Sequence, residues 1–180
     1  MKLNEKGGEM MNIELKKWSL DDKEGLMNIM NHIDRTYLSN RLPFPYTEDH
    51  ALYWFKMVQE HEGKDGVYRA ICVDGHIVGN ISIEKMSDIY SKDSEIGYSL
   101  LPEFKSKGIM SEAVKLICHI AFEELDIHRI TGLVFRSHIA SLKVLENNQF
   151  VLEGIKKQAV YKHNQIYDLC IYGRMKNNHV

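Results

Sequence analysis

The chain has 180 residues, 44% of them hydrophobic, and its 23 basic and 25 acidic side chains nearly balance. Chains of roughly 100–200 residues usually fill one hydrophobic core, so the length indicates a single domain. The formal net charge of −2 gives no electrostatic basis for binding nucleic acid, which requires a basic surface.

Targeting and metal signals are also weak. No window approaches the roughly 18 consecutive apolar residues that span a bilayer, and the opening residues MKLNEKGGEMMN lack the apolar stretch of a signal peptide. Cys72, Cys118 and Cys170 lie far apart in apolar segments, and the nine histidines show no paired metal spacing. We therefore expect a cytoplasmic protein with buried free cysteines, no metal and no membrane contact.

Alternating and helical patterns predict the elements of the first half of the chain. Residues 1–11 are polar and contain glycine, so we expect a flexible leader before one domain over 12–180. Two prolines in LPFPYTEDH interrupt the helical pattern, and Thr47 offers a cap for the next helix. Asp74-Gly75 is typical of a tight turn between strands. The predicted segments are a strand at 12–18, helices at 19–32 and 47–63, and strands at 67–73 and 77–83.

The second half is built around the most regular helical pattern of the chain, residues 108–125. The strand EIGYSLL (95–101) precedes this helix, and a dense β-segment (128–135) follows it. One face of the helix is predicted to carry Ile109, Ala113, Leu116, Ile117 and Ile120. The remaining segments are a helix at 137–148 and a closing antiparallel pair at 150–160 and 165–172. This order, β-α-α-β-β-β-α-β-α-β-β, predicts a mixed α/β (α+β) domain.

A short cationic turn, KSKGIM, precedes the long helix. The first backbone N–H groups of a helix have no intrahelical partner, and the helix dipole adds partial positive charge there. Gly108 lets the backbone approach a ligand, Lys105 and Lys107 add charge, and Ser106 adds a hydroxyl donor. The turn therefore predicts a pyrophosphate site on the N–H groups from Lys105 to Ser111, although a plain strand-to-helix loop with solvated lysines has a similar composition.

The turn lacks the Gly-Lys-Ser/Thr ending of a Walker loop and the three glycines of a dinucleotide fingerprint. With the preceding EIGYSLLPEF and the following SEA, it resembles the acetyl-CoA motif of the GNAT superfamily of N-acetyltransferases, Gln/Arg-x-x-Gly-x-Gly/Ala. Lys105 stands at the Gln/Arg position, Gly108 at the first glycine and Met110 at the second small residue. Met110 departs from the motif but keeps the backbone N–H that would contact phosphate.

Segments downstream resemble the ribosomal-protein alanine N-acetyltransferase branch, in which Asn-x-x-Ser, a helix, Gly-Phe and Glu-Gly follow one another. This chain has HIAS at 138–141, the helix SLKVLENN, QF at 149–150 and EG at 153–154. His138 therefore replaces the usual asparagine, and Gln149 replaces the usual glycine. The segment LPFPYTEDH also matches a Pro-x-Pro-Tyr segment of that branch, so the resemblance covers about residues 12–175.

The resemblance implies a mostly antiparallel mixed sheet with helices on both faces. The expected strands at 95–101 and 128–135 would splay around acetyl-CoA, which would be the acetyl donor. The residues that the resemblance and the turn assign to the cofactor are Tyr98, Leu100, Leu101, Lys105, Ser106, Lys107, Gly108, Ile109, Met110, Ser111, His138 and Ser141.

Acetyl transfer to an amine needs a base for the amine proton, donors for an oxyanion and a proton for the leaving thiolate. The resemblance places the oxyanion at backbone N–H groups within 98–101 and the Ser141 hydroxyl near the sulfur, while a helix-capping role for Ser141 stays open. Glu95 is the expected base and Glu84 an alternative, with a solvated edge carboxylate as the competing interpretation. Three positions separate Glu95 from Tyr98, so only one of them is expected to face the acetyl group.

The acceptor is the least specified part. The resemblance implies a primary amine, on a protein N-terminus or on a small molecule such as a polyamine or an aminoglycoside. The segment TYLSNRLPFPYT would cover the substrate side, with Arg41 as a candidate anchor for a carboxylate. A homodimer through the closing strands is a further expectation. The competing function is a CoA-binding sensor or interaction module without catalysis, which the departures at Met110 and His138 favour.

Overall fold

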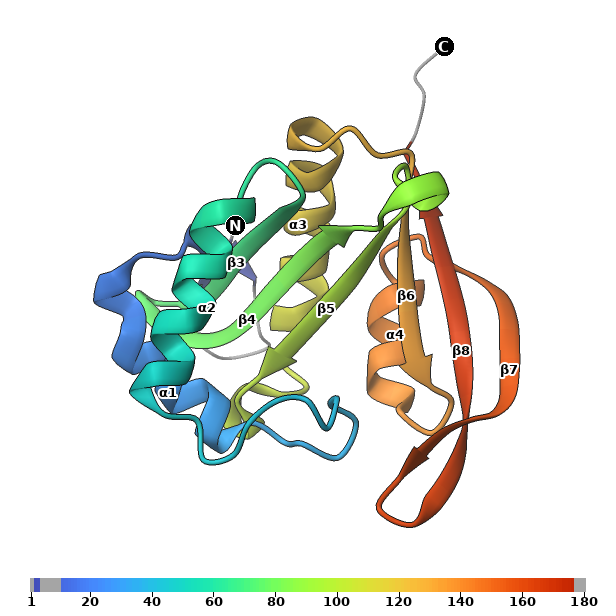
Figure 1. Cartoon of the computed structure of the whole chain (residues 1–180), viewed down its shortest axis with the longest axis horizontal. Helices are drawn as coiled ribbons and strands as arrows, with labels where there is room; N and C mark the ends of the chain where they lie inside the picture. The colour runs from blue at the N-terminus through green and yellow to red at the C-terminus, as the bar shows by residue number, and fades with distance from the viewer. Residues whose placement is uncertain (1, 4–10, 177–180) are drawn as a thin grey trace.

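Eight strands form one sheet in the computed structural model, which describes residues 2–3 and 11–176. Their order across the sheet is β1-β2-β3-β4-β5-β6-β8-β7, and every neighbouring pair is antiparallel except β5 and β6 (Figure 1). The strands are β1 (Lys2–Leu3), β2 (Met11–Lys17), β3 (Gly66–Val73), β4 (His76–Lys85), β5 (Ser94–Leu100), β6 (Arg129–Phe135), β7 (Val151–Lys162) and β8 (Gln165–Met175). The predicted mixed, mostly antiparallel α/β fold is confirmed.

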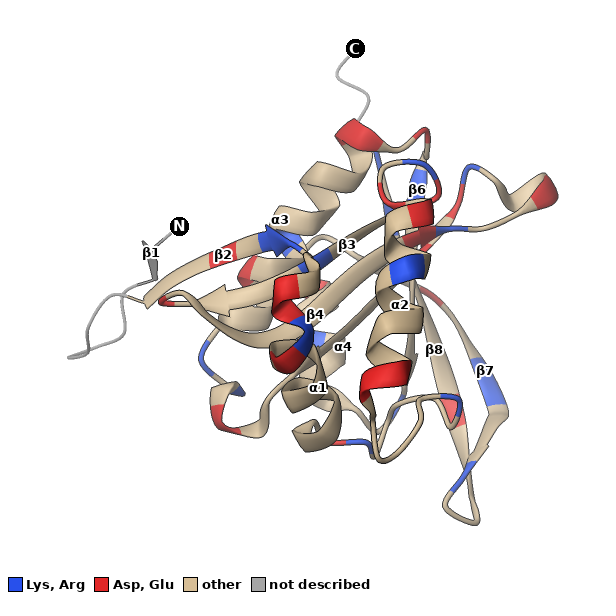
Figure 2. Cartoon of the chain, turned by 60° about the vertical axis from the view of Figure 1, so that its left-hand side comes forward, with Lys and Arg blue, Asp and Glu red and all other residues tan. Residues whose placement is uncertain are grey.

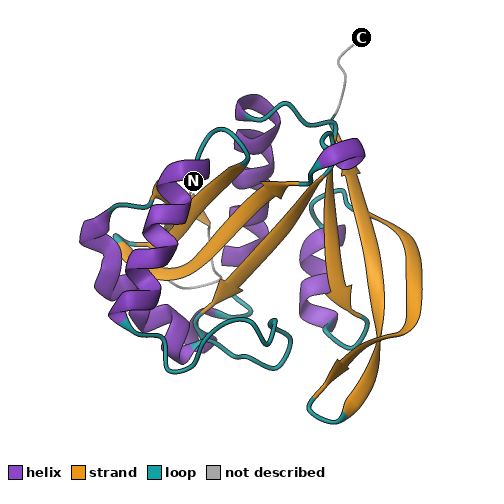
Figure 3. Cartoon of the chain, in the orientation of Figure 1, coloured by secondary structure: helices purple, strands orange, loops and turns teal. Residues whose placement is uncertain are grey.

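Four α-helices cover the sheet from both sides (Figure 3). They are α1 (Lys23–His32), α2 (Glu48–His61), α3 (Ile109–Glu124) and α4 (Ile139–Glu146). Helices α1 and α2 pack against β4 and β3, α3 crosses β2, β3 and β4, and α4 lies against β6 and α3. From β2 onward the order of elements is the predicted one, and only the ends of the segments shift by a few residues.

The expected leader, residues 1–11, lies mostly outside the described residues. Of its described members, Lys2 and Leu3 pair with Asn12 and Met11 as the short strand β1, and Met11 opens β2. The domain expected over 12–180 is described up to residue 176.

Two apolar clusters fill the two sides of the sheet. The larger cluster joins α3 to the strands, and the smaller joins α1 and α2 to the segment between them. The buried stripe of α3 is Ile109, Glu112, Ala113, Val114, Ile117, Cys118 and Ala121. Leu116 and Ile120, which periodicity assigned to the buried face, are only partly buried. The stripe is rotated because α3 contacts α4 as well as the strands.

The charged side chains are interspersed along the described chain, as Figure 2 shows. The longest described helix, α3, has 16 residues, and none of the described helices is long and apolar enough to cross a membrane. No cluster of three or more potential metal ligands occurs among the residues that the structure describes. The three cysteines are free and buried, as expected.

Strands β5 and β6 separate almost at once. They pair in parallel at one position, Glu95 with Thr131, whereas β4 pairs with β5 from Lys85 to Gly79. The two strands diverge from that point toward the lower edge of the sheet in Figure 1. The predicted splay is confirmed, and it leaves one edge of β5 without a strand partner over Tyr98 to Leu100.

Candidate functional site

A cavity of about 650 Å³ opens where β5 and β6 diverge. Its walls come from β5, from the turn before α3, from α4 and from the strap, the name used here for residues 33–47 between α1 and α2. Ten of the twelve expected cofactor residues line it: Tyr98, Leu100, Lys105, Ser106, Gly108, Ile109, Met110, Ser111, His138 and Ser141. The sheet and the turn therefore bring together residues that are more than 40 positions apart in the sequence.

Leu101 and Lys107 are the two expected cofactor residues that do not line the cavity. Leu101 donates its N–H to Val78 O at 2.9 Å and is buried in the α1–α2 cluster. Its backbone is therefore committed to the sheet and is not a donor for an oxyanion. The Lys107 ammonium lies over the Phe104 ring, 5.4 Å from its centroid. Leu101 and Lys107 thus lie outside the cavity lining, and their contact with the cofactor stays a prediction.

The turn before α3 presents free backbone donors to the cavity. Ser106 and Gly108 have left-handed backbones, with φ of 62° and 77°, and the first intrahelical bond runs from Glu112 N to Gly108 O at 3.1 Å. The N–H groups of residues 109–111 precede that bond and have no intrahelical acceptor. Met110 packs its side chain against the core. The side chain that departs from the family motif is thus directed at the core, and the turn keeps the donors for an anion.

Lys105 connects this turn to the strap. Its Nζ lies 2.9 Å from Asp34 Oδ2. Hydrogen bonds from Thr36, and then from Lys105, hold the pKa of Asp34 well below its usual range. Asp34 is therefore a carboxylate at any usable pH, and it places one negative charge beside the expected pyrophosphate site.

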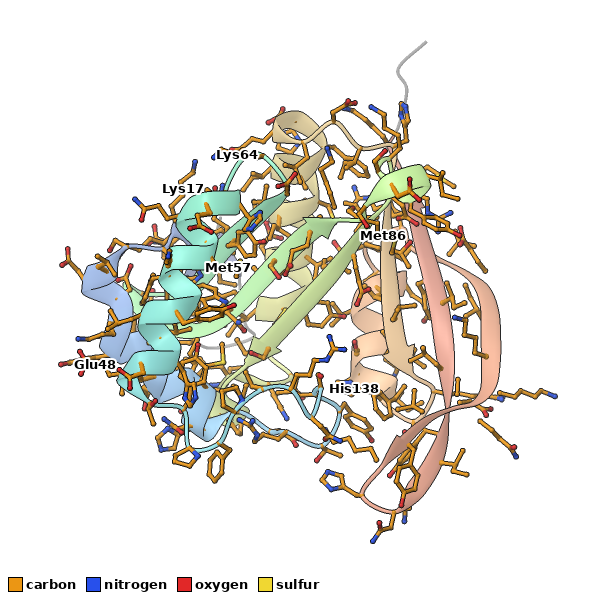
Figure 4. All side chains as sticks on the ribbon, viewed as in Figure 1. Lys17, Glu48, Met57, Lys64, Met86 and His138 are labelled. Carbon is orange, nitrogen blue, oxygen red and sulfur yellow. The ribbon has the colours of Figure 1, made fainter. Side chains whose placement is uncertain are left out.

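His138, labelled in Figure 4, lies where the strap reaches the start of α4. Its ring stacks on Tyr37, with centroids 4.2 Å apart and an interplanar angle of 14°. Desolvation, and then repulsion from Lys105, lower the pKa of His138. The imidazole is therefore neutral near pH 7 and offers one donor and one acceptor to the cavity.

Ser141 and Tyr98 meet at the inner wall of the cavity. Their hydroxyl oxygens lie 2.7 Å apart, and Ser141 is 6% exposed. The N-cap of α4 is His138, so the capping role that the sequence left open for Ser141 is not the one seen. Desolvation raises the pKa of Tyr98 to about 12, against the opposing effect of its hydrogen bond with Ser141. The phenol is therefore un-ionised at neutral pH.

Glu95 lies outside the cavity, on the opposite face of β5 from Tyr98. Residues 96 and 100 are buried in the α3 cluster, so alternation directs Glu95 to the side of α1 and α2. It is exposed and directly opposite Glu84 on β4. Desolvation, and then repulsion from Glu84 and Asp93, raise the pKa of Glu95. Glu95 thus lies where β5 and β6 still pair, on the face of the sheet opposite to Tyr98.

Several cavity residues were not found from the sequence. Lys143 on α4 and Asn147, the C-cap of that helix, line the cavity, and their i, i+4 spacing was the available signal. Tyr37 and Asp34 come from the strap, whose path no local pattern predicts. Asn148 is buried and donates to Ser111 O at 3.0 Å, so it ties the end of α4 to the start of α3.

Side chains on β7 and on α1 hold the strap. Lys162, on β7, is 6% exposed; its Nζ donates to Arg35 O at 2.6 Å and to Leu38 O. Asn31, on α1, accepts from Tyr46 N at 2.8 Å and donates to Tyr46 O at 2.9 Å. The strap therefore has fixed attachments on α1 and on the β7–β8 hairpin, and it reaches toward the lower end of the gap (Figure 1).

Comparison with known proteins identifies relatives of this architecture. The chain is 29% identical over 118 residues to the putative ribosomal N-acetyltransferase YdaF of Bacillus subtilis, covering 66% of this chain and 64% of the relative. It is 33% identical over 116 residues to the probable N-acetyltransferase YjcK of the same species, covering 64% and 62%. The chain thus spans a little under two thirds of the length of these relatives.

A solved structure shares the fold. It is RimL, a ribosomal L7/L12 alpha-N-protein acetyltransferase in complex with coenzyme A, with a TM-score of 0.79 and 22% identity, covering 91% of this chain and 93% of that one. The model of the acetyltransferase (GNAT) domain matches residues 12–151, which run from the second residue of β2 past α4 and include every residue that lines the cavity. The chain belongs to the GNAT acetyltransferase family.

Proposed function

We propose that the chain transfers the acetyl group of acetyl-CoA to a primary amine, and that the acceptor is the N-terminus of a protein. The observation that carries the proposal is one continuous cavity that joins the start of α3, the unpaired edge of β5 and the Ser141 hydroxyl. An anion site, a set of backbone donors and a proton donor in that sequence match the pyrophosphate, thioester carbonyl and sulfur of acetyl-CoA.

In this proposal the donor lies along the gap. The N–H groups of residues 109–111 and the Lys105 ammonium hold the pyrophosphate, where Gly108 allows close approach. The pantetheine arm runs beside the unpaired edge of β5, with His138 at its side, and the thioester reaches Tyr98 and Ser141. Backbone N–H groups of β5 that point into the gap would stabilise the oxyanion, because β6 supplies no acceptor for them beyond Glu95.

The chemistry balances in three steps. The ammonium of the acceptor loses one proton to a base, and the free amine attacks the acetyl carbon to give a tetrahedral adduct with a negative oxygen and a positive nitrogen. The C–S bond then breaks, its electron pair goes to sulfur, and the adduct nitrogen loses its extra proton. Ser141 gives its proton to sulfur and takes one from that nitrogen, so the products are the amide, the thiol and one proton.

Glu95 is the proposed base for the first step. It is exposed at the paired end of β5 and β6, and its raised pKa brings the carboxylate closer to the acidity that a general base needs near neutral pH. Glu84 and Asp93 add negative charge beside it. This concentration of carboxylates favours a cationic acceptor such as an ammonium group.

A protein N-terminus is the acceptor class that the relatives favour. One relative is named for ribosomal N-acetylation, and the solved structure is titled an alpha-N-protein acetyltransferase. The outer face of β6 beside the gap also exposes Leu133, which gives the residues after an N-terminus an apolar contact. Hydroxyl groups at the inner wall favour an enzyme over a CoA-binding module without catalysis, because CoA binding alone does not require them.

The test is thiol release from acetyl-CoA with a panel of amines, with the products identified by mass spectrometry. The panel holds peptides that begin with alanine, serine or methionine, each with internal lysines, together with spermidine and an aminoglycoside. We expect release with a peptide and modification at its α-amine. The matched control is the same peptide with a blocked N-terminus, which should be inert.

Two outcomes contradict parts of the proposal. Release with spermidine or the aminoglycoside alone would keep the acetyltransferase and reject the protein acceptor. No release with any amine, from a protein that binds CoA in calorimetry, would reject catalysis and favour the binding module.

A further inference from the structure

Tyr98 contributes the only side-chain hydroxyl that contacts Ser141 Oγ among the hydrogen bonds of the described residues, at 2.7 Å. The same phenol oxygen lies 3.5 Å from Ser141 O, a distance too long for a strong bond. Tyr98 comes from β5 and Ser141 from the first turn of α4, so the contact crosses the inner wall of the gap. The two hydroxyls form a pair in which each can donate to the other.

Acidity decides the direction of this bond. A phenol is a far stronger acid than an aliphatic alcohol, so the favoured arrangement has Tyr98 donating and Ser141 accepting. Ser141 Oγ then has one lone pair occupied, while its own proton and its second lone pair are free. Both remaining positions are directed away from the phenol, and Ser141 lines the cavity.

This arrangement fits the proton relay of the proposed reaction. The relay requires Ser141 to donate to sulfur and to accept from the adduct nitrogen, and both atoms are bonded to the same carbon. A serine without a fixed partner can rotate its hydroxyl toward the backbone carbonyl three or four residues earlier, which for Ser141 is that of His138 or Ser137. The Tyr98 donor at Oγ makes that rotation unfavourable, because it would turn the accepting lone pair of Ser141 away from the phenol proton.

We propose that Tyr98 is a positioning residue that orients the Ser141 hydroxyl toward the sulfur of acetyl-CoA. This inference rests on the proposed function and adds a residue that acts through Ser141. Tyr98 does not itself supply the proton, because its O–H is engaged with Ser141 Oγ at 2.7 Å, whereas Ser141 gives up its proton only as it takes one from the adduct nitrogen. The phenol keeps its proton and shares it with Ser141 Oγ throughout the reaction.

The experiment compares Tyr98→Phe with the wild type, using the peptide of the acceptor panel that gives the highest wild-type rate. We expect kcat to fall about tenfold, the usual effect of one hydrogen bond, with the affinity for acetyl-CoA in calorimetry unchanged. The second acetyl donor is the selenoester analogue of acetyl-CoA. Its selenolate is a weaker base than the thiolate, so its departure depends less on proton donation. The loss of rate in Tyr98→Phe should be much smaller with the selenoester.

Two further variants separate positioning from structure. Tyr172→Phe is the matched control. Tyr172 Oη, from β8, donates to Glu146 at 2.7 Å on α4, the helix that carries Ser141, and Tyr172 lies outside the cavity lining. It should leave the ratio of selenoester to thioester rates unchanged. In the Ser141→Ala background, Tyr98→Phe should cost no further rate, because its effect passes through the serine.

Each result supports the inference or rejects it. An unchanged kcat in Tyr98→Phe, an equal loss with both donors, or additive losses with Ser141→Ala would reject the positioning role while leaving the acetyltransferase intact. No wild-type turnover in the same assay would reject the proposed function and this inference with it. A variant that does not fold is recognised by its melting curve, and Tyr98→Trp, which keeps an aromatic ring without the phenol, then takes its place with the same expectations.

Discussion

Ser141 has a partner and a position that favour chemistry over structure. It is buried in the first turn of α4, and its hydroxyl faces Tyr98 and the cavity. We expect Ser141→Ala to lower kcat by about 100-fold, the low end for general-acid assistance because water can enter the vacated space. The affinity for acetyl-CoA should hardly change, and the lost hydrogen bond should cost about 0.5–1.5 kcal/mol of stability.

The measurement pairs a rate at saturating substrates with a thermal melt. Ser137→Ala is the control, since Ser137 is exposed just before α4, and neither quantity should change for it. If Ser141→Ala lowers the melting temperature but leaves the rate per folded molecule intact, Ser141 has no part in the chemistry.

Glu95 gives a prediction about pH. A base must be ionised to act, so kcat/KM should fall as the pH drops through the raised pKa of Glu95. Repulsion from Glu84 is one cause of that raised value. Replacing Glu84 with glutamine removes this repulsion and lowers the pKa of Glu95, so the acidic limb of the profile should move to lower pH.

The profile of kcat/KM against pH for wild type and Glu84→Gln measures this shift. Glu60→Gln removes an exposed carboxylate from α2 and should leave the limb in place. A limb that does not move, or that is still present in Glu95→Gln, would show that another group limits the rate at low pH.

Single residues also mark where sequence reasoning stops. The family motifs located Gly108 and Ser141, because each motif is a short run of neighbouring residues that can be recognised without the fold. Leu101 was expected to contact the cofactor but lies outside the cavity lining, because its N–H faces β4, and no local pattern specifies that direction. The contact between Tyr98 and Ser141 spans 43 positions, and no periodicity in either segment encodes it.

At the scale of elements, one buried lysine contributes two of the hydrogen bonds that hold the strap. Lys162 Nζ donates to the carbonyls of Arg35 and Leu38. These bonds join the strap to β7, which lies more than 120 positions away in the sequence. Lys162→Met keeps most of the apolar side chain but removes the ammonium group that makes both hydrogen bonds. We expect a loss of about 1–3 kcal/mol, because two carbonyls lose their charged partner, and faster hydrogen exchange over residues 33–47.

Lys157→Met on the same strand is the control, since Lys157 is exposed and should change neither property. The KM for the acceptor should rise in Lys162→Met, because a loosened strap positions the substrate side poorly. Exchange rates over 33–47 that match the wild type would mean that Asn31 and Lys105 suffice to hold the strap.

Local patterns predicted the elements well and their connections poorly. Alternation, helical periods and turn signals predicted all four helices and the strands from β2 to β8, although β3 is buried along its whole length and β7 is mostly exposed. The path of the strap was not predictable, since Asn31, Lys105 and Lys162 hold it from three separate elements. The buried stripe of α3 was displaced for a similar reason, because its contact with α4 is a tertiary property.

At the scale of the whole molecule, two half-sheets meet at a narrow junction. Beside the single pairing of β5 with β6, Ser94 Oγ donates to Arg129 O at 2.9 Å and Thr131 Oγ1 donates to Asp93 Oδ1 at 2.8 Å. At the other end of the gap, Asn148 links α4 to α3. A ligand in the gap would contact both halves and add to these few links.

Coenzyme A is therefore expected to stabilise the whole fold. At a concentration 100 times its Kd, a ligand that binds only the folded state adds about 2.7 kcal/mol. For a chain of this size, that corresponds to a rise in melting temperature of about 5–11 °C. Hydrogen exchange should slow in both halves, over residues 105–111 and 138–147, because the cavity wall is built from both segments.

Two glycine variants test whether the phosphates hold to the turn before α3. Gly108 and Gly63 have nearly the same left-handed φ, 77° and 75°, so alanine adds similar backbone strain of about 1–2 kcal/mol at either site. Gly63 has nothing within 4 Å of an added Cβ and lies outside the cavity lining.

Both variants should melt below the wild type without ligand. Only Gly108→Ala should lose most of the rise that CoA produces, because its strain displaces the N–H groups of residues 109–111. An equal rise in both variants would place the phosphates elsewhere.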